Sequence, residues 1–214
     1  MSQTRDYGAL SPIDLYFANT PNGQKIVIGC EEMGVAYKLH RISFANKDQF
    51  TPAFLAISPN NKIPAIVDPT GPDGAPLALF ESGAILQYLG NKTGLLYPTA
   101  ARARATCEQW LYWQMAGLGP MSGQAMHFVK FAPERVPYGI ERYTTEVRRL
   151  YGVLNQQLGG HEYIAGDYSI ADIAAYPWVV PHAAIGLDLA DFPHIARWLG
   201  ELGRRPAVAR GMSM

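Results

Sequence analysis

The chain has 214 residues, with 18 basic and 18 acidic side chains and 48% hydrophobic residues, so it can bury a sizeable core in one or two domains. The balanced charge favours neither nucleic acid nor an anionic membrane surface as a partner. With no run of about 18 apolar residues and no signal-peptide pattern, we expect a cytoplasmic protein that is not inserted in a membrane. Cys30 and Cys107 form no CxxC or metal-ligand pattern, so we expect no metal site and two buried, inert thiols.

The first part of the chain predicts a strand, a helix and a second strand. Residues 1–12 are polar and without period, which indicates a loosely held arm. Residues 13–17 alternate as a strand, and 18–23 are dense in turn residues. Residues 24–33 have helical spacing, and 37–42 alternate again. We expect the two strands to pair in parallel through a right-handed crossover.

The stretch that follows predicts a strand, a turn, a strand and a helix. After a short helix over 52–57, the apolar run 63–68 is bounded by turn residues, as a buried strand is. Residues 69–76 are hairpin-turn material, and 77–80 form the return strand. Ser82 is expected to cap the helix that comes next. Together these elements have the order of a thioredoxin-like α/β domain.

The second half of the chain is helical. Residues 93–100 are expected to be a linker between a domain over 1–92 and an all-α domain over 101–214. Helical spacing predicts four helices, over 101–118, over 137–158, from Ser169 onward and over 192–204. The first of them is expected to break or kink at 117–120. Ser169 and Asp172 have the spacing of a capping box, and the helix they open is apolar nearly all round, as a buried central helix is.

Two features of the 58–89 stretch bear on binding. Proline at a strand entrance, as at Pro64, leaves the backbone of Ile63 able to pair with an extended peptide. The start of a helix at Ser82 attracts a carboxylate, and Glu81 beside it can hold an ammonium group. A carboxylate and an ammonium on one carbon of a short peptide describe a γ-glutamyl peptide. The alternative is a strand-entry proline and an ordinary serine cap.

These residues carry a family resemblance. Asn61-Lys-Ile-Pro-Ala-Ile-Val-Asp68, followed by Leu79-Phe-Glu-Ser-Gly-Ala-Ile-Leu-Gln-Tyr-Leu89, resembles the glutathione-binding half of a cytosolic glutathione transferase. Thr20-Pro-Asn-Gly23 resembles the Nu class, known for reducing disulfides with glutathione. The resemblance runs from Ile13 to Pro206. It implies a thioredoxin-like domain followed by an all-α domain, a cis bond before Pro64, and a homodimer.

The resemblance assigns roles to individual residues. Thr20 and Asn22 are implied to activate the sulfur of glutathione. The implied contacts are Gln49 and Lys62 with the glycyl end, Ile63 with the cysteinyl backbone, and Glu81 and Ser82 with the γ-glutamyl end; Pro64 belongs to the binding motif as its cis proline. Arg142 is implied to bind a carboxylate of a second glutathione or of the other half of glutathione disulfide. Gln124, His127 and Tyr138 are further candidates for that second pocket. For Arg142 the alternative is a surface i,i+4 pair with Glu146.

The chemistry expected of Thr20 and Asn22 is stabilisation of a thiolate. A free thiol has a pKa of about 8.5, and only its ionised form attacks a disulfide. A donor aimed at the sulfur favours that form, and about 1.4 kcal/mol of preference lowers the pKa by one unit. The alternative is that Thr-Pro-Asn-Gly is a turn needed only for its backbone.

The sequence therefore predicts a glutathione-dependent disulfide-bond reductase. Two rival hypotheses stay open. One is a conjugating transferase or peroxidase, in which the same thiolate attacks an electrophilic carbon or a hydroperoxide. The other is a regulatory protein that binds glutathione without turnover.

Overall fold

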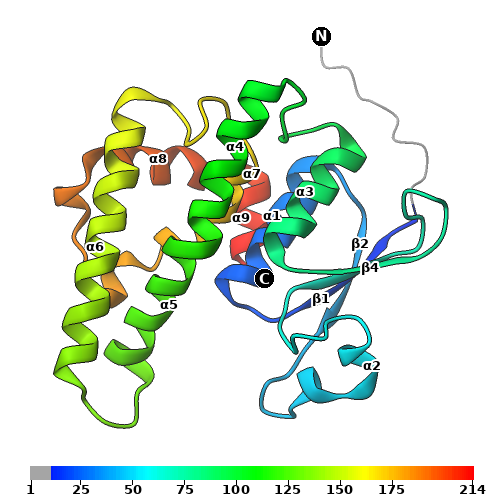
Figure 1. The fold of residues 1–214 in the computed structure, drawn as a ribbon, viewed down its shortest axis with the longest axis horizontal. Helices are drawn as coiled ribbons and strands as arrows, with labels where there is room; N and C mark the ends of the chain where they lie inside the picture. Colours follow the sequence, from blue (N-terminus) through cyan, green and yellow to red (C-terminus); the bar gives the residue numbers. More distant parts are fainter. Residues whose placement is uncertain (1–10) are drawn as a thin grey trace.

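The computed structural model describes residues 11–214, and the predicted arm over 1–12 lies almost wholly outside them. A four-stranded mixed sheet has the order β2-β1-β3-β4, from β1 (Ile13–Phe17), β2 (Tyr37–Arg41), β3 (Ala65–Asp68) and β4 (Leu77–Phe80) (Figure 1). β1 and β2 are parallel, as predicted, and β3 is antiparallel to both β1 and β4. The thioredoxin-like N-terminal domain is confirmed.

Helix α1 (Pro21–Met33) begins three residues before the predicted start. Thr20 is its N-cap, and Thr20 Oγ1 accepts a hydrogen bond from the Gly23 amide at 3.4 Å. The predicted turn 18–23 was wrong in its second half, because proline suits the first position of a helix as well as a turn. An ideal Cβ on Gly23 would lie 2.3 Å from the carbonyl oxygen of Ala18, so this tight entry requires glycine.

The other helices follow in chain order. They are α2 (Pro52–Leu55), α3 (Ser82–Thr93), α4 (Ala101–Trp113), α5 (Gly119–Met126), α6 (Pro137–Gly160), α7 (Ile170–Val179), α8 (Pro193–Gly203) and α9 (Pro206–Met212). The predicted break near 117–120 is instead a π-helical turn, η2 (Gln114–Leu118), inside one continuous helix from α4 to α5. Such wide turns are frequent at functional sites. The all-α C-terminal domain is confirmed.

Helix α9 was missed because Arg205-Pro206 reads as the end of a helix. Proline at the first helical position also starts one, and α9 packs against α1. An ideal Cβ on Gly211 would lie 2.4 Å from Ile28, so the two helices approach closely there. Helix α9 therefore stabilises the position of α1, the helix that Thr20 caps.

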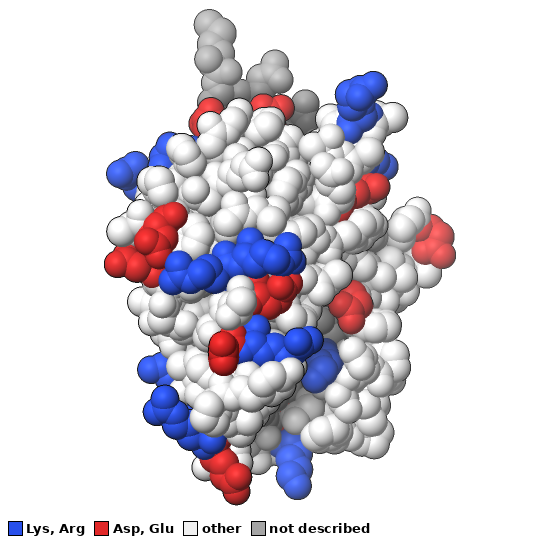
Figure 2. All heavy atoms as spheres, turned by 60° about the vertical axis from the view of Figure 1, so that its left-hand side comes forward, with Lys and Arg blue, Asp and Glu red and all other residues white. Residues whose placement is uncertain are grey.

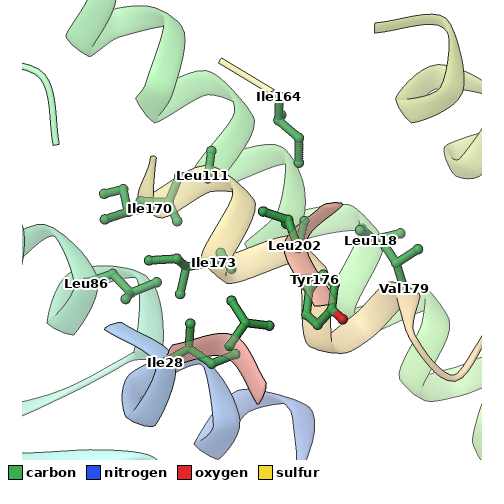
Figure 3. Packing of buried hydrophobic residues seen from close by; sticks show 14 of the residues in the cluster. Ile28, Leu86, Leu111, Leu118, Ile164, Ile170, Ile173, Tyr176, Val179 and Leu202 are labelled. Carbon is green, nitrogen blue, oxygen red and sulfur yellow. The ribbon is translucent and has the colours of Figure 1, made fainter. Parts of the chain in front are cut away.

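Helix α7 is the buried centre of the C-terminal domain, as predicted. Ser169 and Asp172 form the capping box, and the Asp172 carboxylate also accepts hydrogen bonds from the Ile164 amide and the Trp198 indole. In Figure 3, Ile28 of α1 and Leu86 of α3 lie beside Ile170 and Ile173 of α7. The two domains thus share one packed core, and this core fixes the orientation of one domain relative to the other.

Both cysteines are buried and free, as predicted. Within residues 11–214, no helix is long and apolar enough to cross a membrane. Figure 2 shows acidic and basic side chains interspersed on the face turned forward. Ion pairs such as Arg149–Glu146 and Arg197–Glu201 join neighbouring charges along the C-terminal helices.

Candidate functional site

Two adjoining cavities lie where α1, the entrance to β3 and the start of α3 meet. One, of about 400 Å³, is lined by Thr20, Pro21, Asn22, Phe44, Gln49, Phe50, Asn61, Lys62, Ile63 and Trp178. The other, of about 100 Å³, is lined by Asn22, Asn60, Lys62, Ile63, Pro64, Phe80, Glu81, Ser82 and Met115. Asn22, Lys62 and Ile63 belong to both. The predicted site residues, Arg142 excepted, therefore line one connected depression.

The strand-entrance side of this depression is held by a buried serine. Ser58 is fully buried, and its hydroxyl donates to the Lys62 carbonyl at 2.8 Å. The Ile63–Pro64 peptide bond is cis, as the resemblance implied. The Lys62 side chain is exposed at the rim. Gln49 lines the larger cavity, and its Oε1 is buried and has no hydrogen-bond partner among the described residues.

The start of α3 brings Glu81 and Ser82 together differently from the prediction. Glu81, not Ser82, is the N-cap residue, and its backbone has a positive φ of 70°. A non-glycine residue held there costs on the order of 1 kcal/mol or more, and such strain clusters at functional sites. Ser82 is the first helical residue and is 3% exposed, while Glu81 is exposed. Because Ser82 lies one position inside the helix, its hydroxyl does not cap α3; it accepts a hydrogen bond from a buried lysine instead.

That lysine is Lys25 of α1, which the sequence reading missed. It is 1% exposed, and its Nζ donates to Gln114 Oε1 at 2.7 Å, to Ser82 Oγ at 3.3 Å and to Met115 Sδ at 3.4 Å. Burial lowers the pKa of Lys25 to about 7, against the opposing effect of the Glu81 carboxylate. Its partners come from α3 and η2, so no local pattern around position 25 indicated the contact.

Thr20 and Asn22 lie at the start of α1, where the helix dipole is positive. The Thr20 hydroxyl accepts from the Gly23 amide, which leaves its own hydrogen free to donate toward the cavity. Asn22 Oδ1 accepts a hydrogen bond from the Trp178 indole nitrogen at 2.9 Å. With its oxygen engaged there, the Asn22 amide group is directed away from Trp178 as a donor.

Trp178 was predicted to belong to the core of α7. It is instead only half-buried, and it lines the larger cavity. The contact with Asn22 spans 156 residues, which explains why sequence spacing could not predict it. The C-terminal domain therefore orients a side chain of the N-terminal domain.

Arg142 and the other candidates for a second pocket lie on α5, on the π-helical turn η3 (His127–Phe131) that follows it and on α6, apart from the lining of the two cavities. Gln124, His127, Tyr138 and Arg142 are all exposed. The Glu146 carboxylate accepts two hydrogen bonds from Arg149, at 2.7 and 2.8 Å, and Arg142 acts on it through its charge alone, which helps to lower the pKa of Glu146. Among the described residues, no ion pair is recorded for Arg142.

Comparison with known proteins matches both halves of the chain. Residues 20–92 match the family model for the glutathione S-transferase N-terminal domain, and residues 123–206 match the model for the C-terminal domain. The disulfide-bond oxidoreductase YfcG of Escherichia coli is 51% identical over 202 residues, which are 94% of this chain and 94% of that protein.

Solved structures agree. A glutathione transferase from Burkholderia graminis, with two glutathione molecules bound per subunit, has a TM-score of 0.90 and 48% identity over 94% of this chain and 88% of that one. One from Pseudomonas putida, with one glutathione disulfide bound per subunit, has a TM-score of 0.90 and 45% identity over 95% and 91%.

Proposed function

Since the chain belongs to the glutathione S-transferase family, we propose that it reduces disulfide bonds with the thiolate of bound glutathione. The observation that carries this proposal is the single depression that joins Thr20 and Asn22 to Ile63, Glu81 and Ser82. A γ-glutamyl peptide anchored at Glu81 and Ser82 and paired with Ile63 would place its sulfur at the start of α1. Relatives named for disulfide-bond oxidation and reduction, and a neighbour that holds glutathione disulfide, support the same chemistry.

The reaction follows from those positions. The bound thiolate, stabilised by the Thr20 hydroxyl, the Asn22 amide and the α1 dipole, attacks one sulfur of the substrate disulfide. The S–S bond breaks, one thiolate leaves and takes a proton, and a mixed disulfide with glutathione remains. The thiolate of a second glutathione attacks the glutathione sulfur of that mixed disulfide. Glutathione disulfide and the second substrate thiol are released.

The site is proposed to hold two glutathiones, or one glutathione disulfide, per subunit, with Arg142 binding a carboxylate of the second molecule. A guanidinium without a recorded ion pair suits this task. We expect Arg142→Ala to raise the KM for glutathione about tenfold, because the variant loses the charge-assisted hydrogen bonds between the guanidinium and the carboxylate. Initial rates of disulfide reduction measure this. The matched control is Arg149→Ala on the same helix, and equal KM values in the two variants would contradict the role of Arg142.

Trp178→Phe tests whether the Asn22 amide must be held. An aromatic ring is retained, although a smaller one, but Asn22 Oδ1 loses its donor and the carboxamide can rotate. We expect kcat/KM for disulfide reduction to fall about fivefold, because one hydrogen bond contributes about 1 kcal/mol. Trp110→Phe, on α4, is the control. A Trp178→Phe enzyme as fast as this control would mean that the amide orientation does not matter.

Further parts of the proposal concern class and assembly. We propose that the protein is of the Nu class, forms a homodimer, and works in the cytoplasm. The free, buried thiols of Cys30 and Cys107 are compatible with a reducing compartment. The proposed division is a glutathione-binding domain over 1–92, a linker over 93–100 and a helical domain over 101–214.

The proposed reaction is tested by glutathione-dependent reduction of hydroxyethyl disulfide, coupled to glutathione reductase and NADPH, beside conjugation of an aryl halide. Strong reduction with weak conjugation is expected. The reverse result would favour a conjugating transferase, with a hydroperoxide assay to separate the peroxidase. Binding of glutathione without turnover in any assay would favour the regulatory protein.

A further inference from the structure

We propose that Lys25 is the buried cation of the glutathione site: it holds the Ser82 hydroxyl toward the γ-glutamyl carboxylate and takes up a proton when that carboxylate binds. The inference rests on the proposed function in one respect, that a γ-glutamyl group binds at Glu81 and Ser82. It adds a positioning residue that the mechanism above does not use.

The three partners of Lys25 match an ammonium group. Its Nζ faces Gln114 Oε1, Ser82 Oγ and Met115 Sδ, each within 3.4 Å. An ammonium has three N–H donors, one for each acceptor, whereas a neutral amine has two and would leave one acceptor unmatched. The contacts therefore favour the charged form, and the burial of the side chain opposes it.

Ser82 links this cation to the ligand position. Its oxygen accepts from Lys25, so its own hydrogen must go elsewhere, and the structure gives it Met115 Sδ at 3.5 Å. A thioether sulfur is a weak acceptor. A carboxylate at the start of α3 offers a much stronger one. A hydroxyl that donates to a carboxylate also becomes a better acceptor, which strengthens its bond from Lys25. The carboxylate and the ammonium are then joined through one hydroxyl group.

Few other charges act on Lys25. Burial lowers its pKa to about 7, and the Glu81 carboxylate at the start of α3 acts in the opposite direction. The η2 residues beside it, Gln114 and Met115, are uncharged. The titratable groups on or against the rest of α1 are engaged with other partners. On α1 itself, Glu31 binds Tyr37 and Arg210, Glu32 binds Tyr168 and Arg205, and Cys30 is buried. On α3, Tyr88 and Lys92 both bind Asp68; on α7, Asp172 binds Ser169 and Trp198, and Tyr176 is buried.

Ligand binding changes this balance in a definite direction. The incoming carboxylate lies one hydroxyl away from the ammonium and raises the pKa of Lys25. The ammonium of the ligand acts oppositely through Glu81, for which no direct hydrogen bond to Lys25 is recorded among the described residues. The nearer carboxylate dominates. Since the pKa is then higher in the complex, binding takes up a proton above about pH 7, and affinity falls as the pH rises through that window, by at most about tenfold per pH unit.

The test uses S-methylglutathione, which has no thiol to titrate. Titration calorimetry at about pH 7.5, in phosphate and in Tris buffer, gives the number of protons taken up from the difference in heat. We expect about half a proton or more for the unmodified protein. For Lys25→Met we expect much smaller uptake and a Kd about tenfold higher at about pH 7, with a flatter pH dependence. The control is Lys38→Met, an exposed lysine of β2, which should match the unmodified protein.

The outcomes separate the two proposals. If the unmodified protein binds the ligand without taking up a proton, the role of Lys25 is overturned and the proposed function still stands. This outcome does not depend on any variant folding. Equal uptake by a folded Lys25→Met protein, as judged by circular dichroism, would overturn it too, because a group other than Lys25 would then be taking up the proton. Failure of the unmodified protein to bind S-methylglutathione would instead overturn the proposed site.

Discussion

Replacing Thr20 and Asn22 together by alanine is expected to lower kcat/KM for disulfide reduction about 30-fold at neutral pH. Without both donors, the pKa of the bound sulfur returns toward about 8.5, so at about pH 7 only a few per cent of it is ionised. The more basic thiolate is a better nucleophile, which offsets part of the loss. Loss of the groups that position the sulfur acts in the other direction.

The pH–rate profile distinguishes this mechanism from general damage. Because the double variant raises the pKa of the attacking sulfur, its rate should climb with pH and approach the unmodified rate above about pH 9. Thr20 is also the N-cap of α1, and losing a cap costs roughly 0.5–2 kcal/mol of stability, so melting temperatures must accompany the rates. Thr20→Ser keeps both the cap and the hydroxyl and is the control. An unchanged reductase rate in the double variant would end the proposed mechanism.

Glu81→Gln is expected to raise the Kd for glutathione roughly 30-fold or more, the cost of removing one partner of a hydrogen-bonded charge pair. The substitution keeps the size of the side chain but removes the charge that would bind the ligand ammonium. It also removes the carboxylate that supports the charge of Lys25, so the pKa of Lys25 should fall further. Both effects weaken binding in the same direction.

Titration calorimetry of glutathione at neutral pH measures this change, with Glu134→Gln as the control at an exposed acidic residue. The glutamine introduced by Glu81→Gln would occupy the same backbone position with positive φ, so the strain at φ of 70° is the same in both proteins. A Kd equal to that of the control would show that another group holds the ammonium.

The parts of the fold that follow from local pattern were predictable from sequence. The alternation in β1, the turn before β4 and the capping box at Ser169 each lie within a few residues, and each has one physical reading. The resemblance then supplied the architecture and many of the residues that line the two cavities, but not Phe44, Met115 or Trp178. Boundaries failed where one residue type serves two purposes, as Pro21 and Pro206 do at the starts of α1 and α9.

The contacts that complete the site were not predictable in this way. Lys25 reaches Ser82 and Gln114 across 57 and 89 positions, and Trp178 reaches Asn22 across 156. A lysine within an amphipathic helix is ordinarily expected to be solvated, and a tryptophan in an apolar helix is ordinarily expected to be core. Only the packing of α1 against α3, α7 and the η2 turn reverses both expectations.

The wide turn at Gln114–Leu118 also has a consequence for deletions in this part of the chain. A π turn carries one residue more than the α turn it replaces, and one residue corresponds to about 100° of rotation around a helix. Deleting a single residue there would restore a regular helix and turn Gln114 away from Lys25, or else swing Gly119 and Gly123 away from the Trp178 indole that they adjoin. The surplus residue thus keeps two halves of one helix in different registers, each matched to its own neighbour. Relatives that lack it would need either another acceptor for the lysine or an uncharged residue in its place.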